Sequence, residues 1–170
     1  PVAGGDPRDP GLFPANEMVR AGAFSPSGRL VAAASLIPVG QASLQIWDLD
    51  TDEVRVFDQP MDSEAIEGYH AWSLAFVDDS TLYTSGGNGL LRGDLENGSH
   101  VMIRTAPPNG MVGMSVSADR QKMLSYEMEG FYRLDGPLSV HDMQTGGVRS
   151  LTIPGRGEPS LSSDGSTWVT

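Results

Sequence analysis

The sequence contains no cysteine, few basic residues and no long apolar run. Without cysteine the chain forms neither disulfides nor thiolate metal sites, and we expect a reducing, cytoplasmic location. Its 11 Lys and Arg stand against 22 Asp and Glu, a formal net charge of −11. This balance argues against nucleic acid and anionic membranes as partners, because both are bound through clustered basic residues. No stretch approaches the roughly 18 apolar residues expected of a membrane-spanning helix.

The residues that are abundant favour many short elements. The 170 residues include 21 glycines and 12 prolines, a composition that indicates frequent turns. Residues 1–18 hold four of these prolines and three of these glycines, and they are predicted to be an N-terminal linker. From residue 19 onward short runs with strand character alternate with turn residues, and no helical apolar period persists. We therefore expect an all-β chain.

A repeat organises these short runs. A hydrophobic residue leads into a turn in four segments: Phe24–Gly28, Phe76–Ser80, Val116–Arg120 and Leu161–Gly165. A second turn follows each of three aspartates, which are spaced 46 and 48 residues apart: Asp48, Asp94 and Asp142. A leucine stands four residues before each aspartate: Leu44, Leu90 and Leu138. Four strands in a repeat of 40–50 residues are typical of a β-propeller blade, which buries its faces only against its neighbours.

The repeat predicts three blades, at about 19–58, 72–105 and 113–153, and a half-blade at 158–170. The expected strands are 19–25, 30–35, 43–49, 53–58, 72–77, 81–86, 89–95, 100–105, 113–117, 122–127, 138–143, 148–153, 158–163 and 167–170. The ring is therefore expected to be incomplete. Because the sequence begins at Pro1 and stops inside its fourth repeat, we expect it to be a piece of a longer protein.

One repeat resembles a known family. Ile46, Trp47 and Asp48 end a strand, an acidic turn follows, and the next strand begins at Val54. Together with the first hairpin, Phe24–Leu30, this pattern resembles the tryptophan–aspartate (WD) repeat, and the resemblance covers about residues 19–170. The repeat-defining structural residues are Trp47, Asp48, Asp94 and Asp142.

The chain departs from the WD pattern in two ways. The Gly-His pair that opens such repeats is missing from the first and third, and Gly93 and His141 stand where the first repeat has Trp47. The family's buried hydrogen-bonded tetrad is therefore not carried over to any one blade. We interpret the chain as a degenerate member whose blades are held together by hydrophobic stacking, with His141 as a packing residue.

Several motifs resemble known functional motifs but lack a feature that the function requires. Asp48, Asp50 and Asp52 begin like a calcium loop, but the glycine and the chelating glutamate that should follow are absent. Gly86–Gly89 leads into a strand instead of a helix, so it indicates a hairpin turn and not a phosphate loop. Ser162–Trp168 resembles the aspartate box of sialidase-type propellers, itself a structural turn. We therefore predict no catalytic residue, no cofactor and no metal site.

Binding residues are expected in loops. The links between blades and the links between second and third strands should open on one common face. The loop Tyr126–Pro137 carries residue types that are enriched in binding hot spots: Tyr126, Phe131, Tyr132 and Arg133. Tyr69 and His70 belong to the link before the second blade. The alternative is that these aromatic residues fold back and cover a blade edge.

The WD resemblance implies a rigid platform for assembling complexes. We therefore predict a non-catalytic protein–protein interaction scaffold, part of a larger signalling or regulatory protein. Its partner would be another protein or the remaining blades of the same protein, in cis or in trans. Two alternatives stay open: the wall of a propeller-type hydrolase, either a glycosidase or a peptidase-associated propeller, and a self-assembly module.

Overall fold

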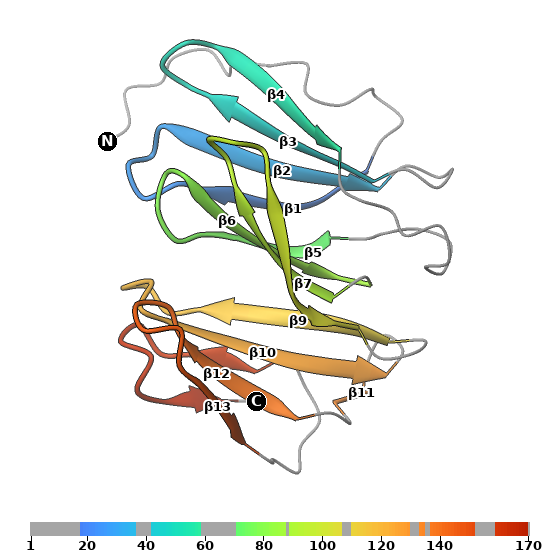
Figure 1. The fold of residues 1–170 in the computed structure, drawn as a ribbon, viewed down its shortest axis with the longest axis vertical. Helices are drawn as coiled ribbons and strands as arrows, with labels where there is room; N and C mark the ends of the chain where they lie inside the picture. The colour runs from blue at the N-terminus through green and yellow to red at the C-terminus, as the bar shows by residue number, and fades with distance from the viewer. Residues whose placement is uncertain are drawn as a thin grey trace.

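The computed structural model describes residues 18–36, 42–58, 71–87, 89–106, 110–129, 133–134, 137–151 and 159–169. Over these ranges the chain forms strands and turns (Figure 1). No helix is present among the described residues, and so none there could cross a membrane. The expectation of an all-β chain is confirmed.

The strands form three antiparallel sheets with four principal strands each, and one pair. The first sheet contains β1 (Met18–Phe24), β2 (Leu30–Leu36), β3 (Ala42–Asp48) and β4 (Glu53–Asp58). The second contains β5 (Ala71–Phe76), β6 (Thr81–Gly86), β7 (Gly89–Asp94) and β8 (His100–Thr105). The third contains β9 (Gly110–Val116), β10 (Lys122–Glu129), β12 (Leu138–Asp142) and β13 (Val148–Leu151), with the short β11 (Arg133–Leu134) beside the end of β10. The pair is β14 (Ser160–Leu161) and β15 (Trp168–Val169).

The sheets stack side by side through their first strands, β1, β5, β9 and β14. Figure 1 shows this succession from blue to red, with the hairpin turns of the first and third sheets on the left. Sequential up-and-down strands that meet their neighbours at the first strand are the arrangement of propeller blades. The sheets are therefore incomplete propeller blades, as the repeat predicted.

Apolar side chains fill the spaces between neighbouring blades. Because side chains alternate along a strand, consecutive residues serve opposite faces. Leu91 belongs to the cluster between blades one and two, whereas Leu90 belongs to the cluster between blades two and three. The repeated leucines Leu44, Leu90 and Leu138 are all buried, each in a different cluster.

Serine hydroxyls close the first hairpin turn of three blades. Ser25, Ser117 and Ser162 accept hydrogen bonds from backbone amides five residues later, at 3.1, 3.0 and 3.0 Å. Each of these turns contains a left-handed residue: Gly28, Arg120 and Gly165, with φ of 76°, 58° and 66°. A short polar side chain that bonds its own turn is the usual device for fixing a hairpin.

The repeated aspartates close the second hairpin turn. The Oδ1 of Asp48 accepts from the amides of Asp50 and Thr51 at 3.0 and 3.4 Å. Asp94 and Asp142 accept in the same way from the amides two and three residues later. The distances are 2.9 and 3.3 Å for Asp94, and 3.1 and 2.9 Å for Asp142. The recurring aspartate is therefore a turn cap, which explains its fixed spacing.

The third blade departs from the predicted boundaries. β9 begins at Gly110 instead of residue 113, β10 continues to Glu129 instead of 127, and β11 was not expected. Tyr126, which the predicted strand 122–127 and the predicted loop Tyr126–Pro137 have in common, lies inside β10, so its prediction as a loop residue is wrong. Its ring occupies the space left by Gly113, which pairs with it across β9 and β10. With 5% of its surface exposed, Tyr126 is a core residue of this blade.

Candidate functional site

The described residues do not include most of the predicted binding loops. Tyr69, His70, Phe131 and Tyr132 lie outside them. The backbone of Arg133 pairs with Glu129 at the end of β10. These five residues stay predictions, and the candidate site that the structure offers lies elsewhere, between the second and third blades.

A β-bulge in β8 turns Arg104 toward the third blade. Leu91 pairs with Met102, and its neighbour Leu90 pairs with Arg104, so Ile103 is an extra residue in the ladder. Without this extra residue, alternation would send Arg104 to the face of blade two that meets blade one. A bulge re-aims the side chain that follows it. Arg104 therefore lies on the same face as Leu90, which is buried against blade three.

Arg104 joins the two blades through several hydrogen bonds. Its Nε donates to Oε1 of Glu127 at 2.8 Å, and its Nη2 lies 2.5 Å from the same oxygen. Nη1 donates to the hydroxyls of Ser125 and Ser139 at 3.4 and 3.5 Å, and Nη2 donates to the carbonyl of Pro137 at 3.4 Å. The Arg104 side chain is only 18% exposed, so these charge-assisted bonds lie in a partly desolvated setting where they are strong.

His141 belongs to the same polar network. Its Nε2 lies 2.7 Å from the hydroxyl of Ser125. Burial and the positive charge of Arg104 lower the pKa of His141, so the ring is neutral at neutral pH. A serine beside a histidine can serve as a nucleophile and its base, but Ser125 is 0% exposed and packed inside the blade interface. The hydrophobic stacking of blades two and three is therefore accompanied by a polar network.

A groove of about 440 Å³ borders this network on the side of the hairpin turns. It runs between the β5–β6 turn, at Asp78, and the β12–β13 turn, at Thr145. Its walls carry polar and apolar residues in similar measure. The residues that line it include Tyr83, Arg92, Ile103, Met123, His141 and Met143.

The acidic groups of this groove are already engaged in turns. Asp142 caps its own turn and forms an ion pair with Lys122, and these bonds lower its pKa well below the usual range. Asp78 accepts from the amide and the hydroxyl of Ser80, at 2.8 and 2.9 Å. Tyr83 and Arg92 face each other across β6 and β7, and burial raises the pKa of the Tyr83 phenol.

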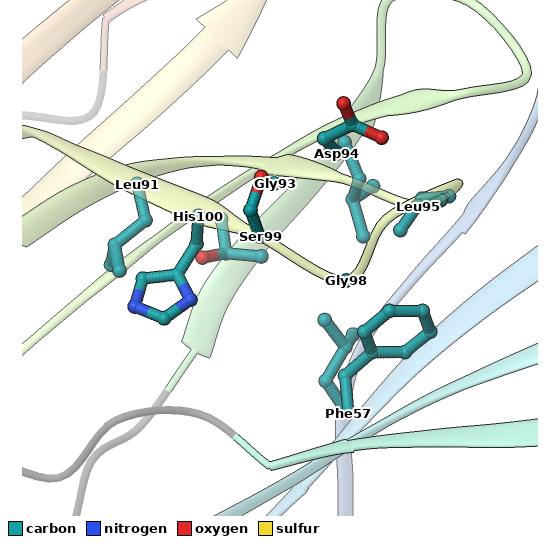
Figure 2. A pocket seen from close by; sticks show the side chains of 11 residues that line it. Phe57, Leu91, Gly93, Asp94, Leu95, Gly98, Ser99 and His100 are labelled. Carbon is teal, nitrogen blue, oxygen red and sulfur yellow. The ribbon is translucent and has the colours of Figure 1, made fainter.

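The spaces between blades one and two contain fewer side chains that could bind or react with a ligand. Figure 2 shows a cavity of about 40 Å³, where Phe57 of β4 faces the β7–β8 hairpin with Leu95 and His100. Leu91 and Leu95 line it from β7 and the following turn, and the Asp94 carboxylate turns away from Phe57 to cap that turn. A cavity this small holds one or two waters. It is a packing defect between two blades.

In a second groove between blades one and two, both arginine side chains already bond to other groups of the chain. Arg29 bonds Asp48 through Nε and Nη2 at 3.0 and 2.5 Å, which lowers the pKa of Asp48 to about 2. Arg55 donates to the carbonyl of Leu95 at 3.1 Å. Within the described ranges, no three His, Asp or Glu side chains gather closely enough to hold a metal ion.

Sequence reasoning did not select Tyr83, Arg92, Arg104 or Ser125. One signal was present in the third blade: Ser125 and Ser139 stand at interior positions of two strands, where apolar residues are usual. A polar residue in the middle of a buried strand needs a hydrogen-bond partner. The partner, Arg104, lies in the preceding blade, and only the folded chain identifies it.

Known proteins were compared with the chain. No protein-family model and no curated protein matches it. Among solved structures, TolB from Acinetobacter baumannii is similar with a TM-score of 0.63 at 16% identity, over 92% of this chain and 38% of that one. Oligogalacturonate lyase in complex with manganese is similar with a TM-score of 0.64 at 15% identity, over 91% of this chain and 47% of that one. The WD40 repeats of RRP9 are similar with a TM-score of 0.63 at 13% identity, over 89% of this chain and 44% of that one.

The fold is that of a β-propeller. The chain spans less than half the length of these three structures. WD-repeat propellers and other propellers occur together among the similar structures. Identities of 13–16% establish the propeller fold alone, since one fold supports many functions.

Proposed function

We propose that this chain is a non-catalytic protein-binding scaffold built from WD-like propeller blades, part of a larger signalling or regulatory protein. The observation that carries the proposal is the exposure of large apolar side chains on rigid strands. Val19, Phe24, Val54, Val56, Val101, Met102, Ile103 and Val148 are all exposed. Apolar side chains gathered on one surface mark interaction sites more often than scattered ones do.

Three of these residues gather on the outward face of the first blade. Phe24 and Val54 lie in one row across the four strands, connected through Val31 and Trp47. Phe24 is 63% exposed and Val56, two residues beyond Val54 on the same face, is 59% exposed. The opposite face of this blade packs against blade two. A sheet with one packed and one exposed apolar face is a suitable platform for a protein partner.

The enzymatic alternative has less support in the described residues. The nearest approach to a catalytic pair is Ser125 with His141, and the serine has no exposed surface. A nucleophile must meet its substrate, so this pair is better explained as a structural bond. Oligogalacturonate lyase and the prolyl endopeptidases are enzymes among the similar structures. Their identities of 15–16% to this chain support a common fold and not a common activity.

The proposal is tested by crosslinking followed by reconstitution. A photo-crosslinking residue placed at Val56 should capture a protein that binds again when both components are purified, with a Kd that Phe24→Ser weakens at least tenfold. A crosslinker at Gln121, an exposed residue in the β9–β10 turn of the third blade, is the matched control. Turnover of a glycan or peptide by the chain, abolished by Ser125→Ala with folding intact, would overturn the scaffold proposal.

A further inference from the structure

We propose that the groove between the second and third blades binds an acidic, apolar segment of a partner protein, with one carboxylate of that segment held by Arg92. The inference rests on the proposed scaffold function and specifies a second contact surface, distinct from the outward face of blade one. Three features of the groove support this binding: its charges, its hydrogen-bond donors and its apolar floor.

Arg92 is an exposed cation of this groove whose side chain has no ion-pair partner among the described residues. Arg29, Arg104 and Lys122 each form an ion pair with a carboxylate. Among the described residues, the side chain of Arg92 forms neither an ion pair nor a hydrogen bond. In a chain with a net charge of −11, a cation left without a carboxylate in a groove favours an anionic ligand. The planar guanidinium matches a carboxylate with two parallel hydrogen bonds.

Two neutral donors accompany this cation. Tyr83 stands opposite Arg92 on the adjacent strand, and its hydroxyl can donate to a carboxylate oxygen. His141 lines the same groove. Since the Ser125 hydroxyl accepts from Arg104, its proton is directed to Nε2 of His141, and the ring proton then resides on Nδ1. Nδ1–H is therefore a donor that the Ser125 bond does not use.

The floor of the groove suits flexible apolar side chains. Met123 is buried, and Met143 packs against the same cluster. Ile103 and Val148 line the groove while remaining exposed. Methionine side chains adapt to ligands of different shape, and about 440 Å³ accommodates a few residues of a peptide. These properties favour an aliphatic residue next to the acidic one.

Two carboxylates in the groove limit where a carboxylate of the segment can bind. Asp78 and Asp142 line the end formed by the hairpin turns, and their negative charge repels a second carboxylate there. The carboxylate of the segment therefore lies at Arg92, and an apolar or basic residue follows toward the turns. The occupant is an extended segment containing Glu or Asp beside Leu or Ile.

The test uses the complete chain and two blocked peptides, acetyl-Leu-Glu-Leu-amide and acetyl-Leu-Gln-Leu-amide. NMR titration should show the Glu peptide shifting the side-chain resonances of Arg92 and His141, with a Kd about tenfold lower than that of the Gln peptide. Arg92→Gln should abolish this difference. Arg149→Gln, on the exposed strand β13 outside the groove, is the matched control and should leave it unchanged. If Arg92→Gln impairs folding, Tyr83→Phe provides the second variant, with a severalfold loss.

The outcomes separate this inference from the scaffold proposal. If a reconstituted partner binds through Phe24 but its affinity is insensitive to Arg92→Gln, the groove inference is wrong and the scaffold stands. If the Glu peptide binds through Arg92 while no protein partner is reconstituted, the groove stands and the scaffold proposal fails. If isovalerate, a free apolar carboxylate, binds as tightly as the Glu peptide, the groove takes a small molecule and the peptide-segment inference is overturned.

Discussion

Glycine serves two different physical needs in these blades. Gly98 and Gly146 occupy left-handed backbone, with φ of 70° and 73°, and an added Cβ would meet no atom within 4 Å. Gly113 is needed for space, because an added Cβ would lie 2.3 Å from the ring of Tyr126. The same residue type is therefore required by backbone conformation in the turns and by packing in the strand.

This distinction predicts different rescue behaviour. Gly146→Ala should lower the free energy of unfolding by about 1 kcal/mol, the cost of a left-handed alanine. Gly113→Ala should cost about 1–3 kcal/mol through overpacking, and adding Tyr126→Leu should recover part of that loss. Urea denaturation of the wild type, the two single variants and the two double variants with Tyr126→Leu measures these changes. A Tyr126→Leu rescue of Gly146→Ala would contradict this account.

The capping carboxylates predict how stability depends on pH. Hydrogen bonds from Arg29 and from turn amides lower the pKa of Asp48 to about 2, and turn hydroxyls and amides lower that of Asp164 to about 2. A carboxyl with a lower pKa in the folded state stabilises fully above its unfolded pKa, near 4, and loses this contribution as pH falls toward 2. Unfolding free energies between pH 5 and 2 should therefore fall less steeply for Asp48→Asn than for the wild type.

At the scale of elements, the bulge in β8 decides how blades two and three are joined. It places Arg104 against Glu127 and two buried serines. Two of the polar groups in this interface, Ser125 and Ser139, would otherwise lack a charged partner. The joint therefore combines an apolar cluster with one satisfied polar network, in which removing one member leaves the others unpaired.

Removing the cation should be costly. Arg104→Met should lower the free energy of unfolding by roughly 3 kcal/mol, because Glu127 would remain partly buried without its partner. Arg149→Met, at an exposed position of β13, is the control and should change stability by less than about 0.5 kcal/mol. Thermal and urea denaturation measure both variants. The double variant Arg104→Met, Glu127→Leu should recover part of the loss, and failure to do so would contradict the proposed coupling.

At the scale of the whole molecule, the outward face of blade one predicts self-association. Phe24 and Val56 lie exposed on a sheet whose other face is packed. The isolated chain should therefore form dimers or larger species at micromolar concentration, and Phe24→Ser with Val56→Ser should shift it toward monomer. Light scattering measures the mass. A compact wild-type monomer at these concentrations would contradict the prediction.

Much of the fold could be predicted from local patterns. Fourteen strands were expected, and the structure contains a strand in each of those positions, because alternation and turn chemistry act over a few residues. The aspartates Asp48, Asp94 and Asp142 were recognised as repeat markers for the same reason. The candidate groove could not be predicted, since Tyr83 and Arg92 come from blade two and His141 from blade three.

The sequence by itself determined the blade repeat, because each hairpin is closed by residues within five positions of one another. Only the tertiary structure decided where Tyr126 and Arg104 lie. The ring of Tyr126 needed the empty space at Gly113 on the neighbouring strand, and Arg104 needed acceptors 21, 23 and 35 residues away in the next blade. The first contact depends on the register of two strands within blade three and the second on how blades stack, and no short stretch of sequence encodes either.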